Sequence, residues 1–368
     1  MRKRILKNME WGILICTVIL IVIGMVALFS ATQNSNYDEL KKQIVWIMVS
    51  IPILIAIIAI DYELLIKIAP ILYGIIILLL AGVLFTTPIN GATSWYNIGA
   101  VSFQPAELAK IVIILSLTYT IVKIQARGKK EINVIYKLAI ILGVAMVPVL
   151  LIIKQPDYGT AIAFIMALIF MLFVAGIDKK YIIIAIAVVI VAVPLLYFFI
   201  LPEHAKTRID VYLNPNLDPR GAGYNIIQSK LAIGAGQLFG MGLLKGNQTQ
   251  LGFLYPKTTD FIFSVIGEEL GFIFAAGIIV LYVVLITKAI YVAKTAKDLE
   301  GSYIAAGIAG IFFFHMLENI GMTMGLLPIT GIPLPFVSYG GSSLLSNIIM
   351  IGILLNISGR RQKVLFIE

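Results

Sequence analysis

The sequence predicts an all-α polytopic membrane protein with about ten transmembrane helices and both termini in the cytoplasm. The first observation behind this is composition, since 60% of the 368 residues are hydrophobic and only 13% are charged. A soluble domain carries roughly half apolar and about a quarter charged residues. We therefore expect residues 1–368 to form a single integral membrane domain with no separate soluble part.

The second observation is a series of apolar runs. Each is long enough, or nearly so, to cross about 30 Å of hydrocarbon at about 1.5 Å per residue. The break at residues 155–160 separates two runs, or else it is a kinked, re-entrant segment. The runs lie near residues 11–31, 43–60, 65–86, 105–122, 138–154, 160–176, 182–200, 261–287, 303–325 and 343–357.

The third observation is the placement of basic residues. With ten spans, the clusters fall on one side of the membrane, which the enrichment of cytoplasmic loops in Lys and Arg identifies as the inside. Segment 201–260 then becomes a large extracellular loop between helices 7 and 8, either functional or simply solvated. Its amphipathic stretch, 224–244, suits the membrane surface. The clusters are Arg2, Lys3, Arg4 and Lys7; Lys123, Arg127, Lys129, Lys130 and Lys137; Lys179 and Lys180; Lys288, Lys294 and Lys297; and Arg360, Arg361 and Lys363.

Several classes of function are disfavoured by the same sequence. The net charge of +9 needs no nucleic-acid partner, because the basic residues are those of cytoplasmic loops. Cys16 is the single cysteine, so no intrachain disulfide can form. Only His204 and His315 are present, so we predict no histidine-based metal site.

Two charged residues stand three apart at the start of the fourth predicted span. Glu107 and Lys110 share one face of a helix whose first position suits Pro105. Charges at membrane depth are costly and often mark sites. The pair is either a structural ion pair or part of a cavity that holds a polar or anionic ligand.

Other acidic residues stand where predicted helices begin. Asp157, between Pro156 and Gly159, is either a turn former or a site residue. Asp260 stands where the long outer loop enters the eighth span, as a helix cap or as a carboxylate that a polar headgroup can reach.

Glu268 and Glu269 lie deeper in the same span. Adjacent side chains diverge by about 100°, so we expect them to have different partners. A buried base, His315 or Glu318 are the candidates, and we predict that Glu268 supports the site without touching the substrate.

The last segment of interest, 331–343, makes a resemblance evident. Its Pro-Leu-Pro-x-x-Ser-Tyr-Gly-Gly-Ser pattern resembles the signature of the SEDS family (shape, elongation, division and sporulation), which includes RodA, FtsW and SpoVE. The ten-helix topology with a large loop between helices 7 and 8 is similar as well. Further motifs follow the family's order: Ser94-Trp95, Gln104-Pro105-x-Glu107-x-x-Lys110, Gln155-Pro156-Asp157-x-Gly159-Thr160, Gln248-Thr249-Gln250 and Asp260-Phe261-Ile262-Phe263.

The resemblance implies a peptidoglycan glycosyltransferase of the bacterial plasma membrane that polymerises lipid II. Asp260 would be the catalytic base, or it would bind a divalent cation, Mg or Mn, that serves the diphosphate. Trp95 and Asp157 would contact substrate. Lys110, positioned by Glu107, and Arg208 would stabilise the departing diphosphate. Ser338 and Tyr339 would support the site from the signature segment.

Partners are implied in the same way. They are a class B penicillin-binding transpeptidase, other membrane proteins of the elongation complex and membrane lipids. The short termini resemble the RodA branch more than FtsW or SpoVE. A flippase or transporter for the lipid-linked precursor, and a non-catalytic scaffold for the transpeptidase, are the rival hypotheses.

One motif departs from the family. The residues before the catalytic Asp often read Pro-Glu-x-His-Thr-Asp, whereas residues 255–260 here read Tyr-Pro-Lys-Thr-Thr-Asp. A second carboxylate or an imidazole at those positions is therefore not available.

Overall fold

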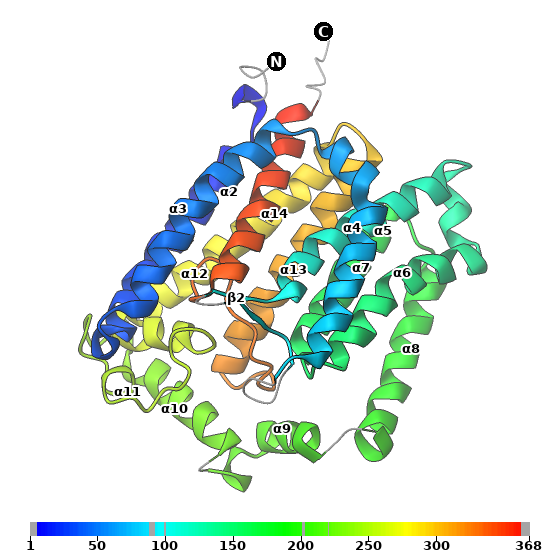
Figure 1. Cartoon of the computed structure of the whole chain (residues 1–368). Helices are drawn as coiled ribbons and strands as arrows, with labels where there is room; N and C mark the ends of the chain where they lie inside the picture. The colour runs from blue at the N-terminus through cyan, green and yellow to red at the C-terminus, as the bar shows by residue number, and fades with distance from the viewer. Residues whose placement is uncertain (1–5, 88–92, 99–100, 201–202, 220, 362–368) are drawn as a thin grey trace.

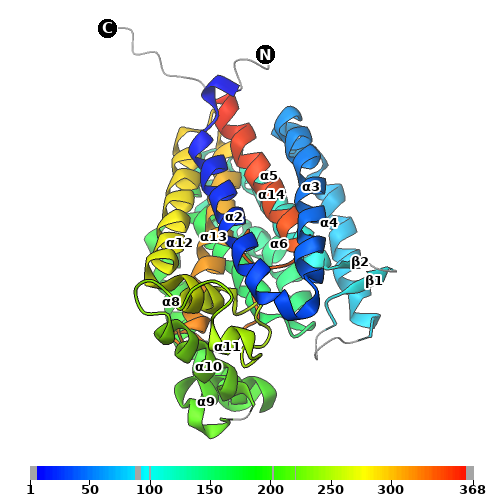
Figure 2. The same cartoon turned by 90° about the vertical axis from the view of Figure 1, so that its left-hand side faces the viewer.

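The computed structural model describes residues 6–87, 93–98, 101–200, 203–219 and 221–361 as a bundle of long helices (Figures 1 and 2). Each of the ten predicted apolar runs falls on one of them. The long helices are α2 (Trp11–Ala31), α3 (Asp38–Ala59), α4 (Tyr62–Gly82), α5 (Pro105–Gln125), α6 (Ile135–Ile153), α7 (Tyr158–Ala175), α8 (Lys179–Leu195), α12 (Ile262–Thr295), α13 (Leu299–Thr323) and α14 (Gly341–Arg360).

Eight of these helices are long and apolar enough to cross a membrane, judged by length and composition. The other two predicted spans correspond to α5, which carries Glu107, Lys110 and Lys123, and to α8, which has 17 residues. The break near residue 155 is a connection between separate helices, because α6 ends at Ile153 and α7 begins at Tyr158. Ten crossings remain a prediction.

The first and last helices meet at one end of the bundle. The Glu10 N–H donates to Ser358 Oγ over 3.1 Å, and Glu10 Oε2 lies 3.6 Å from Arg361 Nη2. Figure 1 shows the short helices of segment 201–260 at the opposite end. An even number of crossings would produce this arrangement.

The core is built around α13. This helix packs against α5, α7 and α12, and most of its side chains are buried. By contrast, α8 stands apart from the bundle in Figure 1, with large apolar side chains such as Ile183 and Val188 exposed. In lipid such exposure is expected, since helices satisfy their own backbone groups and turn apolar side chains outward.

A small hairpin leads into α5. Strands β1 (Tyr96–Ile98) and β2 (Val101–Phe103) are antiparallel, with Tyr96 opposite Phe103. The Tyr96 hydroxyl donates to the Leu79 carbonyl of α4 over 3.0 Å. This contact fixes the residues just before β1, Ser94 and Trp95, beside the beginning of α5.

The long segment 201–260 is more ordered than a solvated loop. It contains α9 (Glu203–Leu213), α10 (Ala222–Ala235) and α11 (Asn247–Gln250). The predicted amphipathic stretch is helical only as far as Ala235. There α10 packs on α12 so closely that a Cβ on Gly236 would lie 1.8 Å from the Gly267 carbonyl oxygen.

The apolar run 261–287 corresponds to α12, but the helix is interrupted at Gly271. Its φ of 79° and ψ of −177° interrupt α12, and a Cβ there would lie 2.3 Å from Gly240 N. Residues 237–242 satisfy the freed backbone groups. Met241 N donates to Glu268 O over 2.9 Å, and Phe272 N donates to Gln237 O over 2.8 Å. Such a break is tolerated because residues 237–242 provide hydrogen-bond partners for its backbone groups.

The remaining ordered elements are short. They are turns of tight helix at Gln33–Ser35, Val83–Phe85, Lys129–Asn133 and Pro215–Leu217, and one wider turn at Leu196–Ile200.

Candidate active site

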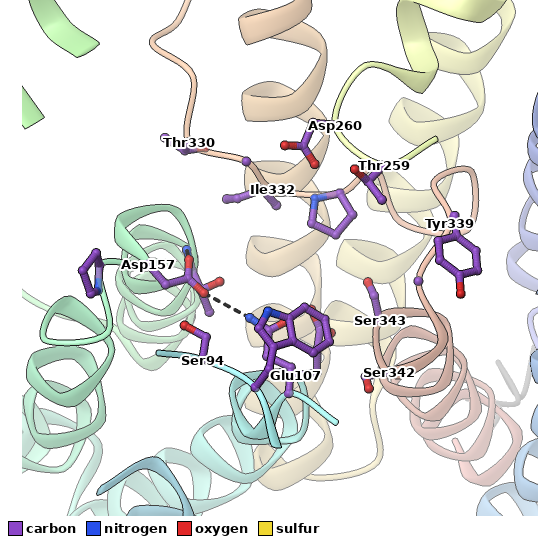
Figure 3. Close-up of a pocket in the computed structure, with 17 residues that line it drawn as sticks. Ser94, Glu107, Asp157, Thr259, Asp260, Thr330, Ile332, Tyr339, Ser342 and Ser343 are labelled. Atoms are coloured by element: carbon purple, nitrogen blue, oxygen red, sulfur yellow. Dashed lines mark hydrogen bonds between the residues drawn. The ribbon is translucent and has the colours of Figure 1, made fainter. Parts of the chain in front are cut away.

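A cavity of about 340 Å³ opens among residues from six separate parts of the chain (Figure 3). It lies where α5, α7, α12 and α14 begin, at the end of the bundle that carries α9 to α11. Its lining is Ser94, Trp95, Gln104, Glu107, Pro156, Asp157, Thr160, Thr259, Asp260, Thr330, Gly331, Ile332, Pro333, Tyr339, Gly340, Ser342 and Ser343.

The convergence of four helix beginnings gives the cavity its electrostatic character. Each helix N-terminus carries a partial positive charge and unsatisfied N–H groups. Together they oppose the three carboxyl groups of the lining, Glu107, Asp157 and Asp260. Anionic groups are favoured at helix N-termini, so the cavity suits carboxylates and phosphates alike.

Asp260 is half-buried and lies just before α12. The N-cap residue of α12 is Phe261, whose own side chain makes no capping hydrogen bond, so Asp260 lies one residue outside the helix. In Figure 3 the Asp260 carboxyl lies beside the loop segment that carries Thr330 and Ile332, across the cavity from Asp157 and Glu107. A Cβ added to Gly331 would lie 3.4 Å from Asp260 Oδ2, so this glycine leaves room beside the carboxylate.

The backbone around Asp260 is held by polar side chains. Asn319 Nδ2 of α13 donates to the Asp260 carbonyl over 3.0 Å and to the Ile332 carbonyl over 2.8 Å. Asn319 was not among the predicted site residues. Its position one helical turn beyond His315 and next to Glu318, in a mostly apolar helix, was the available signal.

Ser338 and Tyr339 tie the signature segment to the residues before Asp260. Ser338 Oγ donates to the Thr259 carbonyl over 2.6 Å, and Tyr339 N donates to the Thr258 carbonyl over 2.9 Å. Tyr339 also lines the cavity, whereas Ser338 lies behind it. The supporting role of both residues stays a prediction.

Glu107 and Lys110 form the predicted ion pair, with 2.7 Å between Lys110 Nζ and Glu107 Oε2. Ser346 Oγ of α14 donates to the same carboxylate oxygen over 2.6 Å. Glu107 lines the cavity, but Lys110 does not, and its side chain is 1% exposed. The lysine charge therefore reaches the cavity from beneath Glu107, not by direct contact.

Asp157 caps α7 and also lines the cavity, so its role as a site residue stays a prediction. Its Oδ1 accepts from Thr160 N over 3.1 Å, and its Oδ2 accepts from Gln104 Nε2 over 3.2 Å (dashed line in Figure 3). Burial raises the pKa of the Asp157 carboxyl, while the bond from Thr160 acts in the opposite direction. Nearby, Ser94 Oγ donates to the Gln155 carbonyl over 3.4 Å, which places Trp95 at the rim.

The predicted partners of Glu268 and Glu269 were a buried base, His315 or Glu318. The hydrogen bonds of both carboxylates in the described part of the chain go elsewhere. Both hold the segment 244–250. Glu268 accepts from Gln248 N over 2.7 Å and from Thr249 N over 2.9 Å, while Glu269 accepts from Gln250 Nε2 over 2.8 Å. The prediction failed because the fold of segment 201–260 onto α12 has no local sequence signal.

Arg208, a predicted site residue, lies on α9, and its side chain is outside the part of the chain that the structure describes. Lys257, at the variable position of the motif before Asp260, donates from Nζ to the Thr249 carbonyl over 2.8 Å. Burial lowers the pKa of Lys257. Among the described residues, no three His, Cys, Asp or Glu side chains are grouped to hold a metal ion.

Comparison with known proteins decides the family. The model of the cell cycle protein family FtsW/RodA/SpoVE matches residues 10–363. The chain belongs to this family. As a member of the FtsW/RodA/SpoVE family built from long apolar helices, it is a multi-pass bacterial membrane protein.

Relatives of the chain cover most of its length. It is 40% identical to the peptidoglycan glycosyltransferase MrdB of Escherichia coli K12 over 80% of this chain and 78% of that protein. It is 30% identical to the peptidoglycan glycosyltransferase RodA of Treponema pallidum, over 98% of this chain and 100% of that protein.

Solved structures show the same fold. A chain from a study of how a peptidoglycan synthase complex coordinates polymerization and crosslinking matches with a TM-score of 0.82 and 27% identity, over 95% of this chain and 97% of that one. The rod shape determining protein RodA of Thermus thermophilus matches with a TM-score of 0.72 and 26% identity, over 96% of this chain and 98% of that one.

Proposed function

We propose that this chain polymerises lipid II into peptidoglycan strands at the outer face of the plasma membrane during cell-wall elongation. The observation that carries the proposal is the cavity that brings Asp260 together with the Glu107–Lys110 pair, Asp157 and Trp95 at four helix beginnings. The reaction class is that of the relatives, which are named peptidoglycan glycosyltransferases.

Polymerisation joins two lipid-linked sugars. A sugar hydroxyl of one lipid II attacks the anomeric carbon of a glycan held on a lipid diphosphate. A new C–O bond forms while the bond to the diphosphate oxygen breaks, and the diphosphate leaves with the electron pair. The Asp260 carboxylate, as general base, accepts the hydroxyl proton. Its half-buried position on the cavity wall suits a group that must meet substrate.

The leaving diphosphate needs positive charge that is already in place. The positive ends of four helices meet at the cavity and provide part of it. Lys110 neutralises Glu107, so this pair adds no net negative charge to the lining. In the proposal Arg208, on the outer helix α9, supplies a second cation, and Trp95 and Asp157 contact the sugar.

A divalent cation, Mg or Mn, would have Asp260 as its ligand in the cavity. Because the described residues group no three potential ligands, they make no closed metal site by themselves. When bound, such a cation would add charge against the diphosphate. The step assigned to Asp260 does not depend on it.

A transpeptidase partner is supported by the structural relative from a peptidoglycan synthase complex. We propose that the partner is a class B penicillin-binding protein, joined by other membrane proteins of the elongation complex and by membrane lipids. Assignment to the RodA branch rests on the likeness to MrdB and RodA, and matches to FtsW proteins at up to 38% identity make it a proposal.

The test is a polymerisation assay in detergent, with purified protein, its transpeptidase and lipid II. Detergent has no sidedness, so a flippase or transporter would make no product there, and a scaffold would make none without another polymerase. Glycan strands from the wild-type complex, absent when the transpeptidase is assayed alone, support the proposal. A wild-type complex that assembles but forms no strands would refute it.

A further inference from the structure

Several buried polar atoms around the cavity make no hydrogen bond among the described residues, and two of them have complementary donor and acceptor chemistry. They are Lys110 Nζ, apart from its ion pair with Glu107, and Nε2 of His315. Both side chains are almost inaccessible, since each residue is 1% exposed. A buried polar group that makes no hydrogen bond costs about 1–3 kcal/mol, so two of them near one another need an explanation.

The other nitrogen of His315 determines what Nε2 can do. Its Nδ1 lies 3.2 Å from the carbonyl oxygen of Pro333, which lines the cavity. A carbonyl oxygen only accepts, so Nδ1 carries the hydrogen. In the neutral ring Nε2 is then an acceptor, whereas a lysine ammonium only donates.

Helix packing places the backbones of the two residues about 6 Å apart in depth, and the lysine side chain extends across part of that difference. A Cβ on Gly307 of α13 would lie 3.0 Å from Ile114 Cγ1 of α5. His315 lies eight residues closer to the cavity on α13, or about 12 Å. Lys110 lies four residues closer on α5, or about 6 Å, and its side chain extends further toward Glu107.

We infer that His315 is a positioning residue, whose Nε2 accepts a hydrogen bond from the Lys110 ammonium, directly or through one water. The lysine is then held between Glu107 and His315, and His315 is held by the Pro333 carbonyl of the cavity wall. The link fixes the cation below the diphosphate site. Its catalytic consequence rests on the proposed function, but the contact itself does not.

The contact can be measured without any polymerisation. The chain has only two histidines, so protein labelled with ¹⁵N-histidine and carrying His204→Asn reports on His315 alone. We expect the neutral form with hydrogen on Nδ1, and an Nε2 resonance shifted by several parts per million on removal of the lysine. Glu107→Gln with Lys110→Met removes both charges and avoids a buried unpaired carboxylate. An unchanged Nε2 resonance in this double variant, or hydrogen on Nε2, would overturn the inference.

Kinetics test the role of the contact. His315→Leu should lower kcat by about tenfold to a hundredfold, as expected for a misplaced catalytic group, with a much smaller change in KM. His315→Gln, which keeps an acceptor and a donor, should restore most of kcat. Thr118→Val is the matched control, because Thr118 is a buried residue of α5 with an equally unpartnered hydroxyl. It should match the wild type.

A structural role for His315 gives a different pattern. His315→Leu would then lower thermal stability and leave kcat unchanged below the melting temperature, or Gln would fail to restore a folded variant. Either result overturns the positioning role. An inactive wild-type enzyme would refute the proposed function, and the ¹⁵N experiment would still decide the contact.

Discussion

Glu107 on α5 and the two acids Glu268 and Glu269 on α12 look alike in the sequence, since all three are acidic residues within apolar runs. They differ in the partners that the structure gives them. Glu107 on α5 lies on the cavity wall and meets a buried lysine and a serine. Glu268 and Glu269 on α12 meet backbone and side-chain donors of the segment 244–250. A buried charge in a membrane helix therefore does not by itself identify a site, and its partners decide between substrate contact and scaffold.

The largest effect should come from separating the Glu107–Lys110 pair. Glu107→Leu leaves the Lys110 ammonium buried without its counter-charge, which costs about 3–5 kcal/mol. We expect this variant to be recovered poorly or as aggregate, as measured by size-exclusion chromatography in detergent. Lys110→Met alone should do the same.

The double variant Glu107→Leu with Lys110→Met sharpens the comparison. It should regain a folded, monodisperse state, because no charge is left unpaired, but it should not regain polymerisation. Wild-type activity in this double variant would show that the pair has only a structural role, like Glu268 and Glu269 of α12.

A smaller effect is expected for Glu268→Gln. The amide is neutral and has one acceptor oxygen instead of two, so at least one backbone donor of Gln248 or Thr249 loses its charge-assisted bond outright, at about 1.5–3 kcal/mol. Thermal unfolding in detergent should show a lower melting temperature, while the rate of polymerisation well below that temperature stays near the wild-type value. Asp38→Asn, at a well-exposed acid, is the matched control and should change neither. A Glu268→Gln enzyme that is stable but inactive would contradict the scaffold role.

The smallest effect should be that of Asp157→Asn. Burial raises the pKa of this carboxyl, which means that it disfavours the charged form, so a neutral amide should cost less here than at a fully solvated acid. Asn is as good a helix cap as Asp, so the bond from Thr160 is kept. We expect a stability change below about 1 kcal/mol and a modest change in KM for lipid II. Loss of kcat comparable to that of an Asp260 variant would mean that Asp157 takes part in proton transfer.

The sequence predicts the local features well. The apolar runs anticipate every long helix, the spacing of Glu107 and Lys110 anticipates their contact, and the junction at Asp260 anticipates its exposure to the cavity. These features follow from helical periodicity and from the cost of burying charge, both of which act over a few residues.

The features that depend on distant contacts were not predictable. The interruption of α12 at Gly271 is stabilised by residues 237–242, which supply the missing hydrogen bonds. The sequence near Gly271 does not indicate that this distant segment will pack there. Asn319 acquires its role only when α13 passes beside Asp260 and Ile332. The roles of Glu268 and Glu269 follow from the same folding of the outer segment onto α12.

The most direct measurement is the rate of glycan formation by Asp260→Asn, assayed with lipid II and the transpeptidase partner alongside the wild type. The variant keeps the size of the side chain and removes the base, so the melting temperature should be unchanged. The rate should fall by about a hundredfold or more, the range that general base catalysis contributes. A folded Asp260→Asn enzyme that polymerises lipid II at close to the wild-type rate would contradict the assignment of this cavity as the catalytic site.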